Sequence, residues 1–373
     1  MVLPIPKSIR GLDMTISTRI AKTVASALVL AAIVAAGATA TQAAEKKDFK
    51  VAWSIYVGWM PWGYAADTGI VKKWADKFGI TIEVTQFNDY VESMNQYTAG
   101  AFDAVTLTNM DGLSIPAAGG VDTTAVIVGD FSNGNDAVIL KDKQTLADIK
   151  GQPVNLVEYS VSHYLLARAL ESAGMSEKDV KVVNTSDPDM VGAFQTKDVT
   201  AMVTWNPMVA EILALPDAHK VFDSTQIPGE IIDMMVANTE VLKDNPNFGK
   251  ALAGIWYDTM AAMTADTDAG KAARTAMGVA SGTDLAGFDA QLKATKLFDK
   301  PADAVAFTDS PDLEKTMDLV RGFLFDKGLL GSGAASADVI GIELADGKVL
   351  GDKGNVKLRF SDAYMKDAAA GAL

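Results

Sequence analysis

Short apolar runs alternate with amphipathic stretches along most of the chain, and this alternation limits most strongly what the chain can fold into. Runs typical of β-strands occupy residues 49–57, 80–87, 104–107, 124–128, 137–140, 153–157, 180–184 and 201–204. Helical spacing is found between them, over residues 61–78, 89–99, 111–118, 162–173 and 189–196. Repeated strand–helix–strand units indicate parallel sheets with helices on both faces. The sequence therefore predicts an α/β fold.

Two irregular stretches divide this alternation into parts. Residues 129–136 (GDFSNGND) are rich in turn-forming residues and predict a loop that could act as a hinge. Residues 222–229 predict a second crossing between the parts. Farther on, residues 246–326 are mostly helical in pattern, and residues 342–360 predict a hairpin around Asp346 and Gly347. We expect a first lobe from residues 44–130, a second from residues 131–225, and a return to the first lobe over residues 226–373.

The first 43 residues differ from the rest of the chain. Four basic residues, Lys7, Arg10, Arg19 and Lys22, precede an apolar run over residues 24–37, and small residues follow up to Ala43. This order is typical of a secretory signal peptide. The apolar run is shorter than the ~20 residues that a membrane-spanning helix needs. We expect cleavage after Ala43 and export to the periplasm as a soluble protein.

Charge and cysteine content exclude several classes of function. The formal net charge is −14, and a nucleic-acid-binding protein would need a basic face to neutralise phosphates. The chain has no cysteine, which excludes disulfide scaffolds, thiolate zinc sites, iron–sulfur clusters and thiol nucleophiles. Its two histidines, His163 and His219, do not have the spacing of a metal site. We therefore expect no nucleic acid, no metal and no cofactor.

Polar and aromatic residues follow the predicted strands, where open α/β sheets bind their ligands. The candidate ligand-binding residues are Trp59, Trp62, Asp89, Asn109, Asp111, Glu158, Ser160, His163, Asp187 and Trp205. None of them is Arg or Lys. A site for an anion would use basic donors or helix N-termini, whereas a site for a cation uses aromatic faces and carboxylates. The set favours a small cation, with Glu158 as the main countercharge.

Several of these residues also have structural interpretations. Trp59 and Trp62 could form one face of a core helix, and Asp111 could be a helix N-cap. A hydrolase would need a base beside a nucleophile, and Ser160 with His163 lacks the Gly-x-Ser-x-Gly turn of such enzymes. Outside the candidate set, Trp74 and Trp256 have the pattern of core residues, and His219 is interpreted as part of a surface loop.

Three motifs carry a family resemblance. Residues 158–166 (EYSVSHYLL), 184–189 (NTSDPD) and 204–207 (TWNP) resemble the substrate-binding proteins of ABC importers. Within these proteins the chain looks like the branch for nitrate, sulfonates, taurine and thiamine precursors, over nearly its whole length after residue 43. More narrowly, residues 108–113 (TNMDGL) and 162–164 (SHY) are similar to receptors encoded beside urea carboxylase, which are now understood as guanidine carboxylases.

The resemblance implies a fold and a function. The fold is the two-lobe, type II periplasmic binding protein, in which each lobe is a βα sandwich and the ligand lies in the interlobe cleft. The function is that of a monomeric receptor, not an enzyme, which captures guanidinium and delivers it to ABC permease subunits. Other ligands left open are urea, a sulfonate such as taurine, nitrate and a thiamine precursor. The alternative from another class is an exported hydrolase.

Overall fold

The computed structural model of the chain describes residues 46–373. The predicted signal peptide, residues 1–43, lies outside the described residues. The described part is a mixed α/β structure with two sheets, and this confirms the predicted fold class. None of the helices described in residues 46–373 has the length and apolar character needed to cross a membrane.

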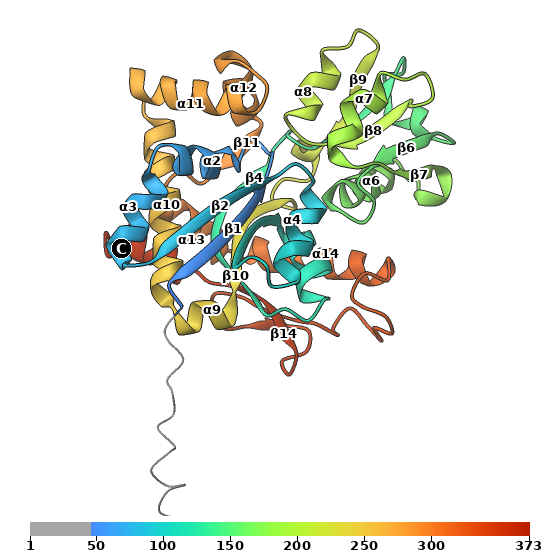
Figure 1. The fold of residues 1–373 in the computed structure, drawn as a ribbon. Coiled ribbons are helices and arrows are strands. Elements are labelled where there is room, and N and C mark those ends of the chain that lie inside the picture. The colour runs from blue at the N-terminus through green and yellow to red at the C-terminus, as the bar shows by residue number, and fades with distance from the viewer. Residues whose placement is uncertain (1–45) are drawn as a thin grey trace, which may run out of the picture. The chain divides into compact units, whose positions relative to one another are not determined.

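The larger sheet has nine strands (Figure 1). Their order is β13-β12-β14-β4-β10-β3-β1-β2, and β11 pairs with β4 beside this path. The strands are β1 (Asp48–Ser54), β2 (Thr81–Phe87), β3 (Ala104–Thr108), β4 (Thr123–Ser132), β10 (Ile232–Asn238), β11 (Thr295–Leu297), β12 (Gly341–Glu343), β13 (Val349–Leu350) and β14 (Val356–Phe360). Strands β3 and β4 are buried along almost their whole length, which explains their continuous apolar runs.

The smaller sheet has five strands, in the order β7-β6-β8-β5-β9. They are β5 (Ala137–Lys141), β6 (Pro153–Leu156), β7 (Lys181–Asn184), β8 (Ala201–Thr204) and β9 (Ala218–Asp223). Helices α6 (Val161–Ser172), α7 (Met190–Phe194) and α8 (Met208–Leu213) lie around this sheet (Figure 1). All five strands fall within the predicted second lobe, residues 131–225. The exact boundaries at residues 130/131 and 225/226 stay a prediction.

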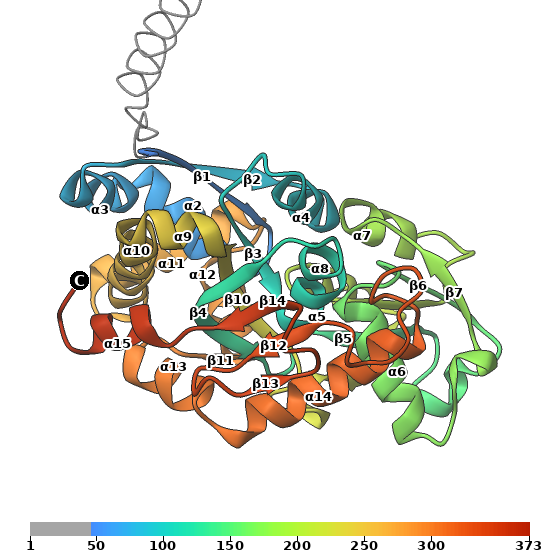
Figure 2. The same cartoon turned by 90° about the horizontal axis from the view of Figure 1, so that it is seen from below.

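The remaining helices belong to the part of the chain that builds the nine-stranded sheet. They are α2 (Met60–Asp67), α3 (Ile70–Phe78), α4 (Tyr90–Thr98), α5 (Asn109–Gly112), α9 (Thr239–Asp244), α10 (Pro246–Thr264), α11 (Asp268–Ala280), α12 (Leu285–Lys293), α13 (Pro301–Thr308), α14 (Pro311–Asp326) and α15 (Ala363–Ala369). In Figure 2, α9 and α10 lie on one side of the strands, and α13 and α14 lie on the other. Trp74 and Trp256 are buried, as predicted.

Two details of the strand pattern differ from the expectation. Neither sheet is purely parallel. In the larger sheet β10 runs antiparallel to both β3 and β4, and in the smaller sheet β5 runs antiparallel to both β8 and β9. The expected loop over residues 129–136 is also too long. Strand β4 continues to Ser132, because it pairs with β10 on one side and with β11 on the other. Only residues 133–136 remain as a connection to β5.

Three further local expectations can be compared with the structure. The expected helix over residues 61–78 is two helices, α2 and α3, separated at Gly69, which has a φ of 81°. His219 does not lie in a loop but in β9, where it pairs with Leu140 of β5. A hairpin does form around residues 346–347, where β12 and β13 pair antiparallel. It ends at Leu350 rather than at residue 360, because β14 pairs parallel with β12.

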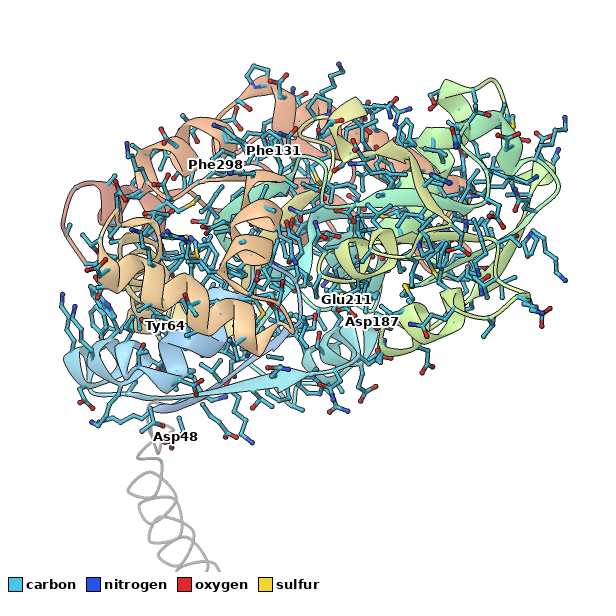
Figure 3. The ribbon with its side chains drawn as sticks, turned by 90° about the horizontal axis from the view of Figure 1, so that it is seen from above. Asp48, Tyr64, Phe131, Asp187, Glu211 and Phe298 are labelled. Atoms are coloured by element: carbon cyan, nitrogen blue, oxygen red, sulfur yellow. The ribbon has the colours of Figure 1, made fainter. Side chains whose placement is uncertain are left out.

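Three phenylalanine side chains pack together near the C-terminal end of β4. Phe131 of β4 and Phe298, which follows β11, are labelled in Figure 3, and their ring centroids are 6.0 Å apart. Phe307 of α13 packs against both rings. These contacts fix the far end of β4, and the same stretch of β4 carries Asp130 toward the candidate site.

Candidate ligand-binding site

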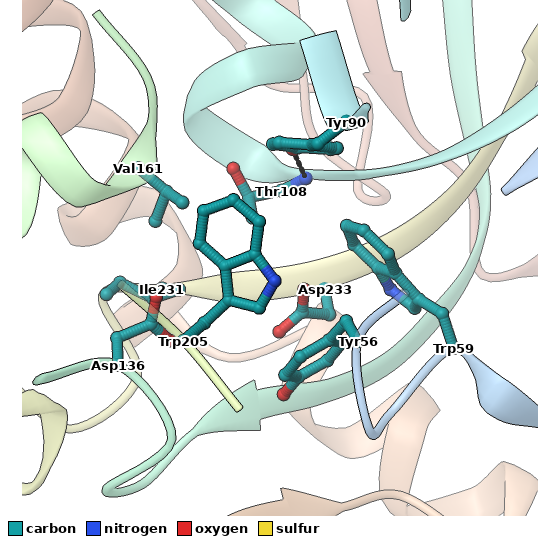
Figure 4. Close-up of a pocket in the computed structure, with 9 residues that line it drawn as sticks. All are labelled: Tyr56, Trp59, Tyr90, Thr108, Asp136, Val161, Trp205, Ile231 and Asp233. Carbon is teal, nitrogen blue, oxygen red and sulfur yellow. Dashed lines mark hydrogen bonds between the residues drawn. The ribbon is translucent and has the colours of Figure 1, made fainter. Parts of the chain in front are cut away.

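A small cavity lies where segments from both sheets meet (Figure 4). We call it the aromatic cavity, and it is lined by Tyr56, Trp59, Tyr90, Thr108, Asp136, Val161, Trp205, Ile231 and Asp233. The empty space among these residues, part of it open to solvent, is about 260 Å³. Thr108 ends β3 and Trp205 follows β8, so the cavity lies at strand ends, as expected for an open α/β sheet.

Four aromatic rings follow one another around the cavity. The ring centroids of Tyr56 and Trp59 are 5.1 Å apart, those of Trp59 and Tyr90 are 5.4 Å apart, and those of Tyr90 and Trp205 are 5.7 Å apart. The first and last of these pairs are edge-to-face, a favoured arrangement of aromatic rings. The indole N–H of Trp205 also donates to the carbonyl oxygen of Ile55, at 3.2 Å. The rings are therefore held in place before a ligand enters.

Two aspartates line the aromatic cavity and a third lies behind it. Asp136 and Asp233 are each only 3% exposed, and Asp130 is fully buried. The hydroxyl of Tyr56 donates to Asp130 Oδ1 at 2.9 Å. No Lys, Arg or His side chain is among the residues that line this cavity. The carboxylates of the site therefore have no cationic partner in the described part of the chain.

Burial makes these carboxyl groups unusually weak acids. Desolvation raises the pKa of Asp136 to about 7, and a hydrogen bond with Ser132 opposes this only in part. Desolvation also raises the pKa of Asp130 and of Asp233, and the Asp130 and Asp136 charges raise the pKa of Asp233 further. A buried negative charge is costly without a partner. A cation in the cavity would supply one.

A second, inner cavity shares Trp59 and Asp233 with the first. It encloses about 190 Å³ and is lined by Trp59, Trp62, Thr106, Ile127, Gly129, Asp130, Asp233, Met234, Met235 and Trp256. Four of its buried polar atoms have no hydrogen-bond partner: Trp59 Nε1, Thr106 Oγ1, Asp130 Oδ2 and Trp256 Nε1. Buried polar atoms of native proteins normally have partners, so this cavity is suited to a polar guest such as water.

Comparison with known proteins gives the family. Residues 42–278, more than half of the chain, match the NMT1-like family. The chain belongs to the NMT1-like family.

Two relatives of the chain are described as binding proteins. A protein of Brucella abortus described as a binding protein is 26% identical over 188 residues, which are 48% of this chain and 56% of that protein. The chain thus spans little more than half the length of this relative. The taurine-binding periplasmic protein of Escherichia coli is 22% identical over 52% of this chain and 61% of its own length.

Solved structures share the fold of this NMT1-like chain. The alkanesulfonate-binding protein of Xanthomonas axonopodis pv. citri, solved with MOPS, superimposes with a TM-score of 0.63 at 16% identity. That match covers 77% of this chain and 96% of the other. The nitrate-binding protein of Synechocystis PCC 6803 gives a TM-score of 0.54 at 11% identity, over 87% and 99% of the two chains. The fold is that of a type II periplasmic binding protein.

Three of the predicted site residues of this NMT1-like chain line the cavities. Trp59 lines both cavities, Trp205 lines the aromatic cavity, and Trp62 lines the inner cavity. Trp62 also stacks on Trp256 with ring centroids 5.8 Å apart. The structure thus places these three indoles together, although Trp205 is more than 140 residues from the other two.

Two more predicted residues support Tyr90 from outside the aromatic cavity. Asp111 accepts hydrogen bonds from the Tyr90 hydroxyl at 2.8 Å and from Thr108 Oγ1 at 2.9 Å. Burial raises the pKa of Asp111 to about 6. The N-cap of α5 is Thr108, so Asp111 does not have that role. Asp187 accepts from the Tyr90 backbone N–H at 3.3 Å, and burial together with Asp89 raises the pKa of Asp187 to about 7.

The other predicted residues make local contacts. Asp89 caps α4, and Ser160 caps α6. Asn109 holds the start of β10, since its Oδ1 accepts from the Ile232 N–H at 3.0 Å. His163 Nδ1 accepts from the Tyr159 N–H at 3.1 Å. None of these four side chains is among those lining the two cavities.

Glu158, the predicted countercharge, is also outside the two cavities. It is half-buried, and its backbone N–H donates to Asn184 Oδ1 at 2.9 Å. Its assignment as the countercharge stays a prediction. Asp136 and Asp233 line the aromatic cavity and are better placed to balance a ligand there.

Sequence reasoning missed the three acidic residues of the site. Asp130 and Asp136 lie in the stretch that was interpreted as a hinge loop, where an acidic residue is ordinary. Asp233 lies within the apolar segment 231–236 (IIDMMV). An acidic residue inside a strand that is otherwise apolar is rarely buried without a functional reason. That signal could have identified Asp233.

We expect Gly58→Ala to damage the site. A Cβ atom at residue 58 would lie 2.5 Å from Asp130 Oδ2 and 2.5 Å from the Tyr56 ring. Such overpacking costs about 1–3 kcal/mol of unfolding free energy, which chemical denaturation would measure. Gly322→Ala in α14 is the control, because its added Cβ would meet no atom within 4 Å. Equal stability of the two variants would contradict the described packing around Asp130.

Proposed function

We propose that this chain is the solute receptor of an ABC importer, exported to the periplasm, and that its ligand is guanidinium. In this role the receptor captures the ligand in the cleft and delivers it to the permease subunits. The NMT1-like family, the type II fold and the binding proteins among the relatives support the receptor role. The choice of guanidinium rests on the chemistry of the aromatic cavity.

One observation carries the choice of ligand. The aromatic cavity combines four aromatic rings with two buried carboxylates and has no basic side chain in its lining. Guanidinium is planar, stays protonated at neutral pH, and offers paired N–H donors that fit a carboxylate. Aromatic faces attract such a flat cation, especially when it is desolvated.

The expected interaction energies are sufficient for a useful receptor. Micromolar binding requires about −8 kcal/mol. Each aromatic face contributes roughly 0.5–2 kcal/mol to holding a cation, depending on desolvation. A hydrogen bond between charged groups contributes about 1.5–3 kcal/mol. One carboxylate pair, two faces and a few neutral hydrogen bonds therefore reach micromolar affinity.

The same chemistry disfavours the anions bound by some relatives. A sulfonate or nitrate in the aromatic cavity would lie beside Asp136 and Asp233 and would find no cation there. Arg168 of α6 lies elsewhere, and its Nε and Nη2 atoms donate to the Glu230 carboxylate at 2.8 and 3.0 Å. Its charge is therefore already balanced. Burial of an anion without a cationic partner is strongly unfavourable.

Urea is the second candidate, and the inner cavity favours it. The N–H groups of Trp59 and Trp256 have no acceptor there, and guanidinium has no acceptor to offer. Urea has the same planar shape and carries a carbonyl oxygen. A water molecule in the inner cavity would satisfy the indoles equally well and leave the aromatic cavity to guanidinium.

The contacts of Ser160 and His163 support a binding protein rather than an enzyme. Ser160 Oγ donates to the Val157 carbonyl oxygen at 2.8 Å and accepts from the Ser162 N–H. His163 Nδ1 is occupied by the Tyr159 N–H, and its Nε2 lies 3.2 Å from the Glu177 carboxylate. The histidine is thus not available to deprotonate either serine, so the arrangement does not resemble a hydrolase site.

A thermal-shift comparison tests this proposal. Guanidinium, urea, taurine and nitrate would each be added at millimolar concentration, where guanidinium does not act as a denaturant. A ligand at 100 times its dissociation constant adds about 2.7 kcal/mol of stability, so guanidinium should raise the melting temperature by several degrees. Taurine and nitrate should have no effect. A shift with taurine alone would show that the cation assignment is wrong.

A further inference from the structure

Asp130 and Asp233 lie opposite each other on neighbouring strands. In the antiparallel register of β4 and β10 they are direct partners, and such partners have Cβ atoms about 4.5–5.5 Å apart. Both side chains are buried. Like charges in this position repel each other, and burial strengthens the repulsion. Both carboxyls can be ionised only if a cation compensates them.

The groups around this pair include no such cation. The Tyr56 hydroxyl, from the connection between β1 and α2, donates to Asp130. Asp136, from the connection between β4 and β5, adds a further acidic group, and Asp111 of α5 acts on Asp136. Neither cavity has a Lys, Arg or His side chain in its lining. Charge balance in the empty site therefore requires protons.

The hydrogen bonding of the pair leads to the same conclusion. Asp130 and Asp233 are direct cross-strand partners, and at that spacing a protonated carboxyl group of one can donate to the other. As two carboxylates they would have no donor between them, and Asp130 Oδ2 would stay without a partner. A single proton held between them supplies the donor, as in other carboxyl pairs that share one proton.

We propose that the empty site stores a proton on the Asp130 and Asp233 pair and releases it to solvent when a cationic ligand is captured. This inference deepens the proposed function and rests on it. The carboxyl O–H bond breaks, the proton passes to the buffer, and the positive charge of the ligand takes its place. Binding thus leaves the net charge of the buried site unchanged.

The acid strength of the site agrees with this exchange. Desolvation, with the nearby charges of Asp130 and Asp136, raises the pKa of Asp233 well above its ordinary value, which favours a held proton when the site is empty. A bound cation lowers these pKa values again. Protons then compete with the cation, so affinity for guanidinium rises with pH, by up to about tenfold per pH unit. Neutral urea would release no proton.

Calorimetric titration of guanidinium in two buffers tests the proton release. Phosphate and bis-tris have different ionisation enthalpies, and bis-tris is too bulky for the cavity. At one pH near 6.5, the difference in measured enthalpy gives the number of protons released, which we expect to be about one per ligand. In Asp130→Asn the amide donates to Asp233 without a stored proton, so fewer protons should be released than by the parent protein.

Asp103→Asn is the matched control. Asp103 is a buried carboxylate that accepts from the Lys50 N–H at 2.9 Å and lines neither cavity, so its variant should release as many protons as the parent. Guanidinium binding with equal enthalpies in both buffers would overturn the inference and leave the receptor proposal intact. Failure of guanidinium to bind would instead contradict the receptor proposal.

Infrared spectroscopy of the ligand-free protein tests the stored proton independently of guanidinium binding. A protonated carboxyl group has a C=O stretching band distinct from that of a carboxylate. Such a band at neutral pH, weaker in Asp130→Asn and in Asp233→Asn but unchanged in Asp103→Asn, would support the stored proton. Its absence from the parent protein would overturn it.

Discussion

Asp136→Asn is expected to weaken guanidinium binding by about 3–5 kcal/mol, a loss of at least a hundredfold. Asp136 lines the aromatic cavity and is almost fully buried. Asparagine keeps the shape and the hydrogen-bonding capacity of the side chain but removes its charge. A desolvated cation that loses one of the two carboxylates lining its cavity is held much more weakly, although Asp233 remains beside it. Calorimetry would measure the change.

The control for this loss is Asp103→Asn, which removes a buried carboxylate outside the cavities. It should change the affinity for guanidinium by less than about 0.5 kcal/mol, as distant substitutions usually do. Circular dichroism would verify that both variants fold. If folded Asp136→Asn binds guanidinium as tightly as the parent, Asp136 is not the countercharge. Glu158→Gln would then become the variant to test.

Trp205→Ala is expected to have the second largest effect. The side chain is buried beside Tyr90, so its truncation should lower the free energy of unfolding by about 3–5 kcal/mol. It should also weaken guanidinium binding by roughly 1–2 kcal/mol, because one aromatic face of the cavity is lost. Chemical denaturation and calorimetry would measure the two losses separately.

Trp205→Phe separates the two contributions of this indole. Phenylalanine keeps an aromatic face but cannot donate to the Ile55 carbonyl oxygen, a bond of about 1 kcal/mol. We expect it to keep most of the guanidinium affinity that Trp205→Ala loses. If both variants bind as tightly as the parent, the ligand does not contact Trp205.

The sequence was informative wherever local pattern determines structure. Continuous apolar runs identified β3 and β6, and Gly174 correctly marked the end of α6. The strand order could not be predicted in the same way. Strand β10 pairs with β3 and β4 across more than 90 residues of intervening chain, and no local pattern specifies such a pairing. For this reason the sequence did not predict that β10 lies antiparallel between β3 and β4.

Only part of the site could be predicted from the sequence, because burial also depends on contacts between distant parts of the chain. Trp59 and Trp205 were identified because aromatic residues at strand ends point to a ligand. Asp130 and Asp136 were missed because their acidity is notable only once they are known to be buried. Burial of these residues depends on Tyr56 and Asp233, which come from distant parts of the chain. The residue types in the sequence indicated a cationic ligand, but only the tertiary structure shows which carboxylates line the cavity.

The most direct test of the account compares guanidinium with urea by calorimetric titration of the parent protein. The two molecules have nearly the same size and planar shape and differ chiefly in charge, so the ratio of their affinities measures how strongly the site selects a cation. With one buried ion pair at stake, we expect guanidinium to bind at least about a hundredfold more tightly than urea. Equal affinities, or tighter binding of urea, would contradict the cation-binding site proposed for this chain.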